Sequence, residues 1–195
     1  CGIRNCVATL GTAITDQHIK KIFRNVPDIL FCFDGDDAGR RAAARALDAV
    51  LPQMNDGLSV RFLFLPEKED PDTIVRKLGR DAFLEMMSSA LPLSEFFFSH
   101  FSTNINTSTP DGKAKLGKTC APQINKIPEG IFKKLMLAKL AELTGLLTND
   151  LQRYLQTNRF KTNLRQRGDA SEESETSSDM AYPDYYLSLI HISEP

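Results

Sequence analysis

Two carboxylates separated by one residue stand directly after a short apolar segment. Asp34 and Asp36 flank Gly35, and residues 29–33 before them read Ile-Leu-Phe-Cys-Phe. Gly35 allows a sharp backbone turn, so both carboxylates can leave the segment together. Grouped carboxylates repel one another and favour a bound cation, and Mg²⁺ prefers such hard oxygen ligands. Asp34 and Asp36 are therefore candidate metal ligands, while an acidic surface turn with a helix cap remains the structural alternative.

A second acidic group follows in residues 66–72, where Asp70 and Asp72 flank Pro71. Asp70 is suited to cap a helix whose first position is Pro71, and Asp72 suits the first turn of that helix. This structural role is compatible with metal binding, because Asp70 can cap the helix while Asp72 faces a metal. With the first group, these acids could hold two cations, as nucleotidyl transfer requires.

Strands and helices are expected to alternate around these acids. Residues 6–10, 29–33 and 58–65 are short and apolar, which indicates buried strands. Helical spacing follows each of them, with helix starts expected at Thr15 and Pro71. This order predicts an α/β fold with a mostly parallel sheet and helices on both faces. Because such sheets bind ligands beyond the carboxyl ends of their strands, both acidic groups are expected at one edge.

The sequence pattern divides the chain into four predicted regions. We predict an α/β domain over residues 1–90 and a small all-α subdomain over residues 91–158, because strand patterns cease near residue 93. Residues 159–186 are rich in Ser, Thr and acids, which is typical of a disordered linker. Residues 187–195 are apolar again, resemble nothing before them, and are expected to be a non-native tail outside the fold.

Composition limits the classes of function. The net charge of −1 gives no general attraction to nucleic acid, so contact with a polyanion must be local. No apolar run approaches the roughly 20 residues of a membrane span, so no membrane partner is expected. The four cysteines form no C-x-x-C pair and the three histidines are scattered, which argues against a zinc site in this chain and fits the cytoplasm. The chain begins with Cys1 and is expected to be a fragment that starts inside a domain.

Three runs of sequence together resemble the toprim domain of bacterial DNA primases of the DnaG type. They are Ala8–Ala13, Phe33–Arg40 and Leu65–Asp72, and their order, spacing and flanking strands all match. The likeness extends through the predicted helical subdomain to about residue 158. The resemblance therefore implies a toprim-type sheet followed by helices.

The resemblance also implies roles for individual residues. Asp34 and Asp36 correspond to the two catalytic, metal-binding carboxylates of the toprim acidic motif. Asp70 and Asp72 correspond to acids that help to bind a further metal. Gly11 and Thr12 correspond to a loop near the nucleotide site. From its place in the first turns of a helix, Arg40 is a candidate for contact with substrate phosphates, although a solvated helix face is the simpler reading.

The implied activity is DNA-templated RNA primer synthesis in chromosome replication, a nucleotidyl transfer that uses Mg²⁺, with Mn²⁺ as the alternative cation. Implied partners are a single-stranded DNA template, ribonucleoside triphosphates and the replicative helicase, the last through a carboxy-terminal domain outside this chain. Zinc would belong to an amino-terminal domain that is also missing. The motif's third acid is a Glu on a first strand that precedes Cys1, so this fragment alone is expected to be inactive.

Four rival readings remain. Gly112–Thr119 matches the P-loop pattern, but no buried strand precedes it and Leu116 belongs to an apolar helix stripe. Phosphatases of the haloacid dehalogenase type also use D-x-D, but Ala38 and Gly39 do not fit their pattern. Another toprim protein, such as a topoisomerase, nuclease or recombination module, is closer. A non-catalytic DNA-binding module is the non-enzymatic alternative.

Overall fold

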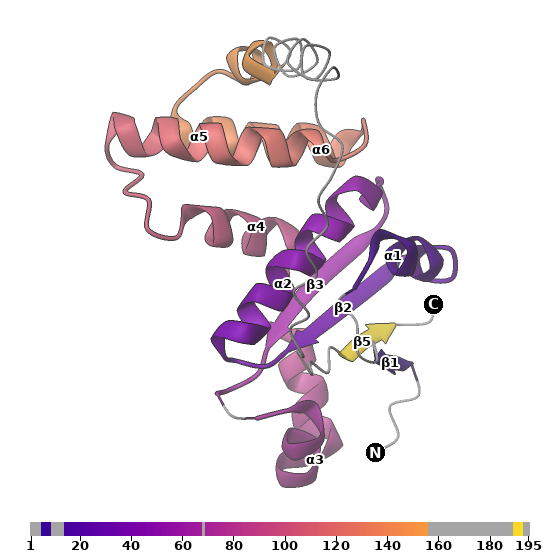
Figure 1. The fold of residues 1–195 in the computed structure, drawn as a ribbon. Helices are drawn as coiled ribbons and strands as arrows, with labels where there is room; N and C mark the ends of the chain where they lie inside the picture. Colours follow the sequence, from indigo (N-terminus) through magenta and orange to yellow (C-terminus); the bar gives the residue numbers. More distant parts are fainter. Residues whose placement is uncertain (1–4, 9–13, 68, 156–188, 193–195) are drawn as a thin grey trace, which may run out of the picture.

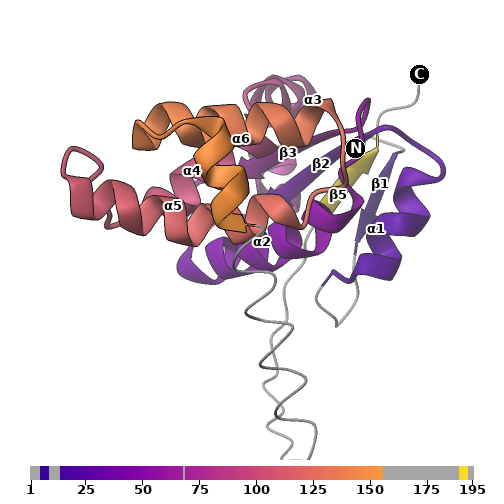
Figure 2. The same cartoon turned by 90° about the horizontal axis from the view of Figure 1, so that it is seen from above.

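The computed structural model describes residues 5–8, 14–67, 69–155 and 189–192. It shows a sheet with helices packed on its faces and further helices stacked at one side (Figures 1 and 2). Gly11, Thr12 and the predicted linker over residues 159–186 lie outside the described residues.

One five-stranded sheet organises the α/β part, in the order β1–β5–β2–β3–β4 (Figure 1). Its strands are β1 (Cys6–Ala8), β5 (Leu189–Ile192), β2 (Asp28–Phe33), β3 (Ser59–Phe64) and β4 (Leu91–Pro92). β2 and β3 pair in parallel over their whole length. β5 is antiparallel to both β1 and β2, and β4 is antiparallel to β3. β1, β2 and β3 therefore run in one direction, as the sequence predicts, and the two antiparallel strands make the sheet mixed.

β5 differs from the expectation for the end of the chain. Residues 187–195 are expected to stand apart from the fold, yet Leu189–Ile192 forms a strand between β1 and β2. Its register pairs His191 with Cys6 on one side and with Leu30 on the other. The physical reason is that β1 and β2 leave a gap one strand wide, where a short apolar segment satisfies open backbone N–H and C=O groups on both sides.

Helices cover both faces of the sheet, as predicted. On one face, α1 (Asp16–Phe23) and α2 (Asp37–Val50) share a buried cluster with Ile29 and Phe31 of β2. On the other face, α3 (Pro71–Ser88) packs against Leu30 and Cys32. Side chains alternate between the two faces of a strand, so covering both faces buries every residue from Ile29 to Phe33. The uninterrupted apolar run before Asp34 is explained by this burial.

Local caps start the helices where the sequence predicts them. Thr15 and His18 form a capping box at the start of α1. Asp36 caps α2, and Asp70 caps α3 with Pro71 at its first position. After α2, the short 3₁₀ helix η1 (Leu51–Gln53) carries the chain towards β3. The starts of α1, α2 and α3 each use a side-chain oxygen that accepts a backbone N–H with no partner in the helix.

The helical part continues the same core. α4 (Leu93–Ser102), α5 (Pro110–Asn125) and α6 (Ile131–Thr144) stack beside the sheet, and residues 148–155 are helical (Figures 1 and 2). Phe96 of α4 stacks on Phe62 of β3 with ring centroids 4.4 Å apart. One buried cluster extends from the sheet through α4 to α5 and α6. None of the described helices is long and apolar enough to cross a membrane.

Two polar contacts join the helical part to the α/β part. Both carboxylate oxygens of Asp56, which precedes β3, accept backbone N–H groups at the start of α6, from Ile131 and Phe132 at 2.8 Å each. These bonds lower the pKa of Asp56. Lys126, after α5, pairs with Asp48 of α2 at 3.1 Å. The start of α6 is therefore capped by a residue far away in the sequence.

The structure contradicts the hypothesis that Gly112–Thr119 forms a P-loop. Gly112–Thr119 lies inside α5, whose amino end is capped by Thr109 through a 3.2 Å bond from the Gly112 N–H. A phosphate-binding loop must follow a strand and leave its backbone N–H groups open. Here the N–H groups from Lys113 onward are used within the helix or its first turn.

Candidate active site

The turn after β2 positions the first pair of acids. Asp34 follows Phe33, the last residue of β2, and α2 begins three residues later. The Oδ1 of Asp36 accepts the backbone N–H of Gly39 at 2.7 Å. A Cβ on Gly39 would lie 2.0 Å from the backbone oxygen of Asp34, so only glycine lets the first turn of α2 rest on this residue. The helix cap thus fixes the orientation of Asp36 next to Asp34.

A close backbone approach brings the second acidic loop to the same edge. A Cβ on Gly35 would lie 2.0 Å from the backbone oxygen of Leu65 and 2.9 Å from the carbonyl carbon of Pro66. The Leu65 N–H donates to the Phe33 oxygen at 2.9 Å, which extends the pairing of β2 and β3 to this edge. The acid-bearing turn and the loop after β3 therefore lie against one another at the carboxyl ends of two parallel strands.

The ionised form of Asp34 is destabilised at this edge. It is half-buried, and its Oδ1 is buried without a hydrogen-bond partner among the described residues. Burial raises the pKa of Asp34, and the nearby carboxylates of Asp36 and Asp70 raise it further. A carboxylate in this position gains from a cation, which supplies both the missing partner and the missing positive charge. The donor chemistry of Asp34 therefore fits a metal ligand.

The two acids of the α3 loop have different surroundings. Asp70 is held as the cap of α3, where its Oδ1 accepts the Thr73 N–H at 2.7 Å and the Thr73 hydroxyl at 2.5 Å. These two bonds lower the pKa of Asp70, the hydroxyl contributing most. Asp72 is exposed and pairs with Arg76 at 2.8 Å. The structure thus places Asp36 and Asp70 within electrostatic reach of Asp34, whereas the contact it shows for Asp72 is with Arg76.

Glu69 is a further candidate that the sequence does not single out. One of its oxygens pairs with Lys77, and the other is buried without a hydrogen-bond partner among the described residues. Like Asp34, it therefore carries a carboxylate oxygen that lacks a donor. The sequence gives no signal for choosing it, because Glu67 and Asp70 stand in the same acidic run.

The described residues do not form a complete metal cage. Within them, no three His, Cys, Asp or Glu side chains are grouped closely enough to hold an ion. Mg²⁺ does not need such a cage, because it keeps several waters and usually binds one or two carboxylates together with substrate phosphates. The chain therefore offers individual carboxylate ligands at the edge of the sheet.

Arg40 lies near this edge, in the first turn of α2. It is exposed in α2, and its guanidinium carbon lies 5.8 Å from the ring centroid of Phe64, the last residue of β3. A cation held over an aromatic ring keeps its N–H groups available to an anion. Arg40 is thus placed beside the carboxyl ends of β2 and β3, as contact with a phosphate would require.

Comparison with known families finds matches over most of the described chain. A toprim-like family model matches residues 1–75, and a model described as the DnaB-helicase binding domain of primase matches residues 94–148. The chain is 55% identical over 146 residues to a DNA primase of Pseudomonas aeruginosa, covering 74% of this chain and 22% of that protein. It is 44% identical over 146 residues to the DNA primase of Escherichia coli K12, covering 75% and 25% respectively. The chain therefore spans about a quarter of the length of these relatives.

Solved structures show the same fold. A DNA primase domain from Pseudomonas aeruginosa superposes with a TM-score of 0.76 at 52% identity, covering 78% of this chain and 48% of that one. The Escherichia coli primase catalytic core gives a TM-score of 0.68 at 44% identity, with coverage of 71% and 44%. A DnaG primase catalytic domain bound to single-stranded DNA gives 0.65 at 44% identity, with coverage of 68% and 43%.

Proposed function

This chain belongs to the bacterial DNA primase family, and on that premise we propose that the complete protein synthesises RNA primers on single-stranded DNA during chromosome replication. The chain supplies part of the catalytic core. The observation that carries the proposal is the state of Asp34, at the end of a strand inside the toprim-like match: its buried oxygen has no hydrogen-bond partner among the described residues, and the carboxylates of Asp36 and Asp70 act on it electrostatically.

Asp34 and Asp36 act in this proposal as ligands of Mg²⁺, for which Mn²⁺ can substitute. The Asp34 Oδ1 has no hydrogen-bond partner among the described residues, and the Oδ1 of Asp36 caps α2, which leaves the Oδ2 of Asp36 for the cation. Asp70 and Asp72 contribute to a second cation, with Asp72 released from Arg76. When bound, the cations lower the pKa of the attacking 3′-hydroxyl and neutralise charge on the leaving pyrophosphate. The carboxylates position the cations and do not attack the nucleotide themselves.

Other residues of the chain bind the substrate in this scheme. Arg40 contacts the phosphates of an incoming ribonucleoside triphosphate from its position over Phe64. Gly11 and Thr12 line the nucleotide site. A third acid, a Glu on a strand before Cys1, completes the acidic motif. Because that acid and the template-guiding part lie outside the chain, the 195-residue chain alone does not synthesise primers.

The partners follow from the same premise. The template is single-stranded DNA, which one of the similar solved structures binds. The replicative helicase is the protein partner, and the family model over residues 94–148 is named for helicase binding. The resemblance implies a helicase contact in a carboxy-terminal domain beyond this chain and zinc in an amino-terminal one, whereas the family model named for helicase binding matches within this chain, over residues 94–148. We assign residues 1–90 to the toprim part and residues 91–158 to the helical part, and place the protein in the cytoplasm at the replication fork.

A chimeric enzyme tests the proposal with residues of this chain. Residues 1–148, which span both family matches, would replace the corresponding segment of the Pseudomonas aeruginosa DNA primase, and Mg²⁺-dependent RNA synthesis would be measured on single-stranded DNA. We expect an active chimera whose activity falls at least a hundredfold on Asp34→Asn, because the first cation loses a charged ligand. Asp81→Asn, which changes an exposed acid of α3 away from this edge, serves as the control.

The result that would contradict the proposal is an active chimera whose activity is equally insensitive to both substitutions. Primer synthesis by the isolated 195-residue chain would contradict the requirement for the third acid. A folded but inactive chimera would show that this segment cannot serve as a primase core.

A further inference from the structure

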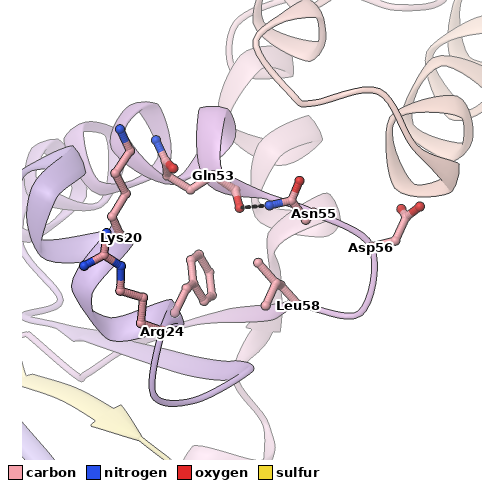
Figure 3. A pocket seen from close by; sticks show the side chains of 7 residues that line it. Lys20, Arg24, Gln53, Asn55, Asp56 and Leu58 are labelled. Atoms are coloured by element: carbon pink, nitrogen blue, oxygen red, sulfur yellow. Dashed lines mark hydrogen bonds between the residues drawn. The ribbon is translucent and has the colours of Figure 1, made fainter.

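A pocket lies at the edge of the sheet opposite to the acids. Its volume is about 410 Å³, which is within the roughly 300–1,000 Å³ of small-ligand sites. The end of α1 with the residue after it provides one wall, and the chain from the last residue of η1 to β3 provides the other (Figure 3). The pocket is lined by Lys20, Phe23, Arg24, Gln53, Asn55, Asp56 and Leu58. β2 separates the two edges by about 20 Å, from its six residues at roughly 3.3 Å each, so this pocket is distinct from the candidate active site.

The charges that face the pocket are positive. Lys20 of α1 and Arg24, the residue that follows this helix, are exposed, and within the described residues neither forms an ion pair. Asp56 is the acid in the lining, but both of its oxygens accept N–H groups from α6. Figure 3 shows its carboxylate directed away from Lys20 and Arg24. The acid is therefore occupied elsewhere, and the two cations remain available to an anion.

The rest of the lining combines apolar surface with amides. Phe23 and Leu58 are half-buried and pack against the main core, so they form a fixed apolar wall. Gln53 and Asn55 face the opening, and the Asn55 side chain donates to the Gln53 backbone oxygen at 3.4 Å (Figure 3). An aromatic ring offers a stacking surface for a planar base, and amides can donate to and accept from its edges. Lysine and arginine complement phosphate.

We propose that this pocket binds one nucleotide unit, with its phosphate at Lys20 and Arg24 and its base against Phe23. The unit is either a free nucleotide or one residue of a single strand, since both present the same groups. An acidic peptide would satisfy the cations but would bring no planar group to the aromatic wall. The inference concerns a second site and does not depend on metal binding at Asp34.

Binding would be measured by fluorescence anisotropy of a short fluorescein-labelled oligothymidylate with the 195-residue chain. EDTA keeps divalent cations away from the acidic edge. We expect the double variant Lys20→Gln/Arg24→Gln to bind about tenfold more weakly. The slope of log affinity against log salt should fall in magnitude by about 0.7, because the two cations contact one phosphate of a single strand.

A charge-matched double variant, Lys21→Gln/Lys115→Gln, is the control. Lys21 lies beside Lys20 in the last turn of α1 and shares its favourable place near the helix end, but does not line the pocket. Lys115 is an exposed residue of α5. The control should bind as the parent does. Equal losses in both double variants would overturn the proposal, because general charge alone would then explain binding.

Further probes distinguish the source and class of the ligand. Asn55→Asp, which adds a negative charge at an exposed position of the lining, should weaken binding without lowering the melting temperature. Competition by thymidine monophosphate supports a free nucleotide as the ligand, and binding of the oligonucleotide alone supports a strand. Displacement of the oligonucleotide by polyglutamate at equal charge concentration would overturn the nucleotide assignment. Asp34→Asn should leave binding unchanged, which separates this test from that of the proposed function.

Discussion

At the scale of single residues, Asp34 shows how a site can be destabilised in the absence of its ligand. Within the part of the chain that the structure describes, its buried oxygen has no hydrogen-bond donor, and the carboxylates of Asp36 and Asp70 act on it electrostatically. An acid whose pKa is raised by folding weakens the folded state once it ionises. The penalty is absent below the ordinary pKa of 3.8, grows as the pH rises through the raised pKa, and is complete above it.

Asp34→Asn should therefore stabilise the chain at neutral pH in EDTA, raising its melting temperature by a few degrees. Mg²⁺ should raise the melting temperature of the parent chain and have little effect on the variant, because a ligand stabilises only the state that binds it. Thermal unfolding monitored by circular dichroism, with and without Mg²⁺, checks both effects. Asp81→Asn should behave as the parent, and an equal response of Asp34→Asn to Mg²⁺ would remove Asp34 from the metal site.

Asp70 has two roles that a pair of substitutions can separate. Asp70→Asn keeps an oxygen for the Thr73 N–H and should preserve the cap of α3, whereas Asp70→Ala removes it and should cost about 0.5–2 kcal/mol in free energy of unfolding. Both variants remove the negative charge and should weaken Mg²⁺ binding equally. Urea unfolding and Mg²⁺ titration provide the two measurements, and equal stability of the two variants would show that the cap contributes nothing.

The pH dependence provides an independent check of the same cap. The pKa of Asp70 is lowered by Thr73, so its contribution to stability is present above the ordinary pKa of 3.8 and is lost as the pH falls through the lowered pKa. The difference in stability between the parent and Asp70→Ala should therefore shrink in strong acid.

The role of a residue was predictable from the sequence where its hydrogen-bond partner lies a few residues away in the chain. Asp36 and Asp70 each accept an N–H three residues ahead, a contact set by helix geometry alone. Glu69 differs, because the burial of one of its oxygens depends on how the loop packs. The pairing of Asp72 with Arg76 is local too, but the sequence cannot show whether that carboxylate prefers the cation of its own helix or a bound metal.

At the scale of elements, the approach of the turn after β2 to the loop after β3 assembles the acidic edge. Gly35→Ala would place a Cβ 2.0 Å from the backbone oxygen of Leu65 and should cost about 1–3 kcal/mol as the two loops separate. Gly117→Ala is the matched control in α5, where the nearest atom to an added Cβ is 3.8 Å away. It should stabilise the helix by about 0.5–1 kcal/mol.

Urea unfolding of the two glycine variants measures these opposite effects. Gly35→Ala should also weaken Mg²⁺ binding, because it moves Asp34 relative to Asp70, whereas Gly117→Ala should not. A Gly35→Ala variant as stable as the parent would mean that the loops are free to move apart without loss.

Elements were predictable from sequence to the extent that their signals are periodic. The apolar runs of β2 and β3 and the helix starts at Thr15 and Pro71 follow from burial patterns and caps. The two-residue strand β4 has no such pattern, and it exists through its pairing with Arg61 and Phe62 of β3. The cap of α6 by Asp56 links residues 75 positions apart, which no local pattern can indicate.

At the scale of the whole molecule, the α/β part and the helical part share one core. The cluster that contains Phe31 and Phe62 also contains Leu116 and Leu140. At the surface, Asp56 joins the two parts by accepting the backbone N–H groups of Ile131 and Phe132. A shared core of this kind resists relative motion of its parts, because separation would expose apolar surface to water. The acidic edge and the proposed nucleotide pocket therefore lie at opposite edges of one sheet. The core shared with the helical part stabilises one face of that sheet.

The central position of β5 leads to the last prediction. β1 and β2 run in the same direction with β5 antiparallel between them, so the gap has the width and orientation for one parallel strand. The strand expected before Cys1, ending in a Glu, would fit this gap and bring its acid to the same edge as Asp34. Parallel pairing there would join β1, β2 and β3 into one continuous parallel set.

We therefore expect the two strands to compete. The chain would be extended at its amino end with the segment that precedes the match in the Pseudomonas aeruginosa primase. Backbone amides of residues 189–192 should then lose protection in hydrogen–deuterium exchange, while those of β1 and β2 stay protected. Mg²⁺ affinity should rise, because a third carboxylate joins Asp34 and Asp36. Replacing the added Glu with Gln should reverse this gain in affinity, whereas β5 should remain displaced. Persistent protection of residues 189–192 in the extended chain would show instead that β5 holds this position against the added strand.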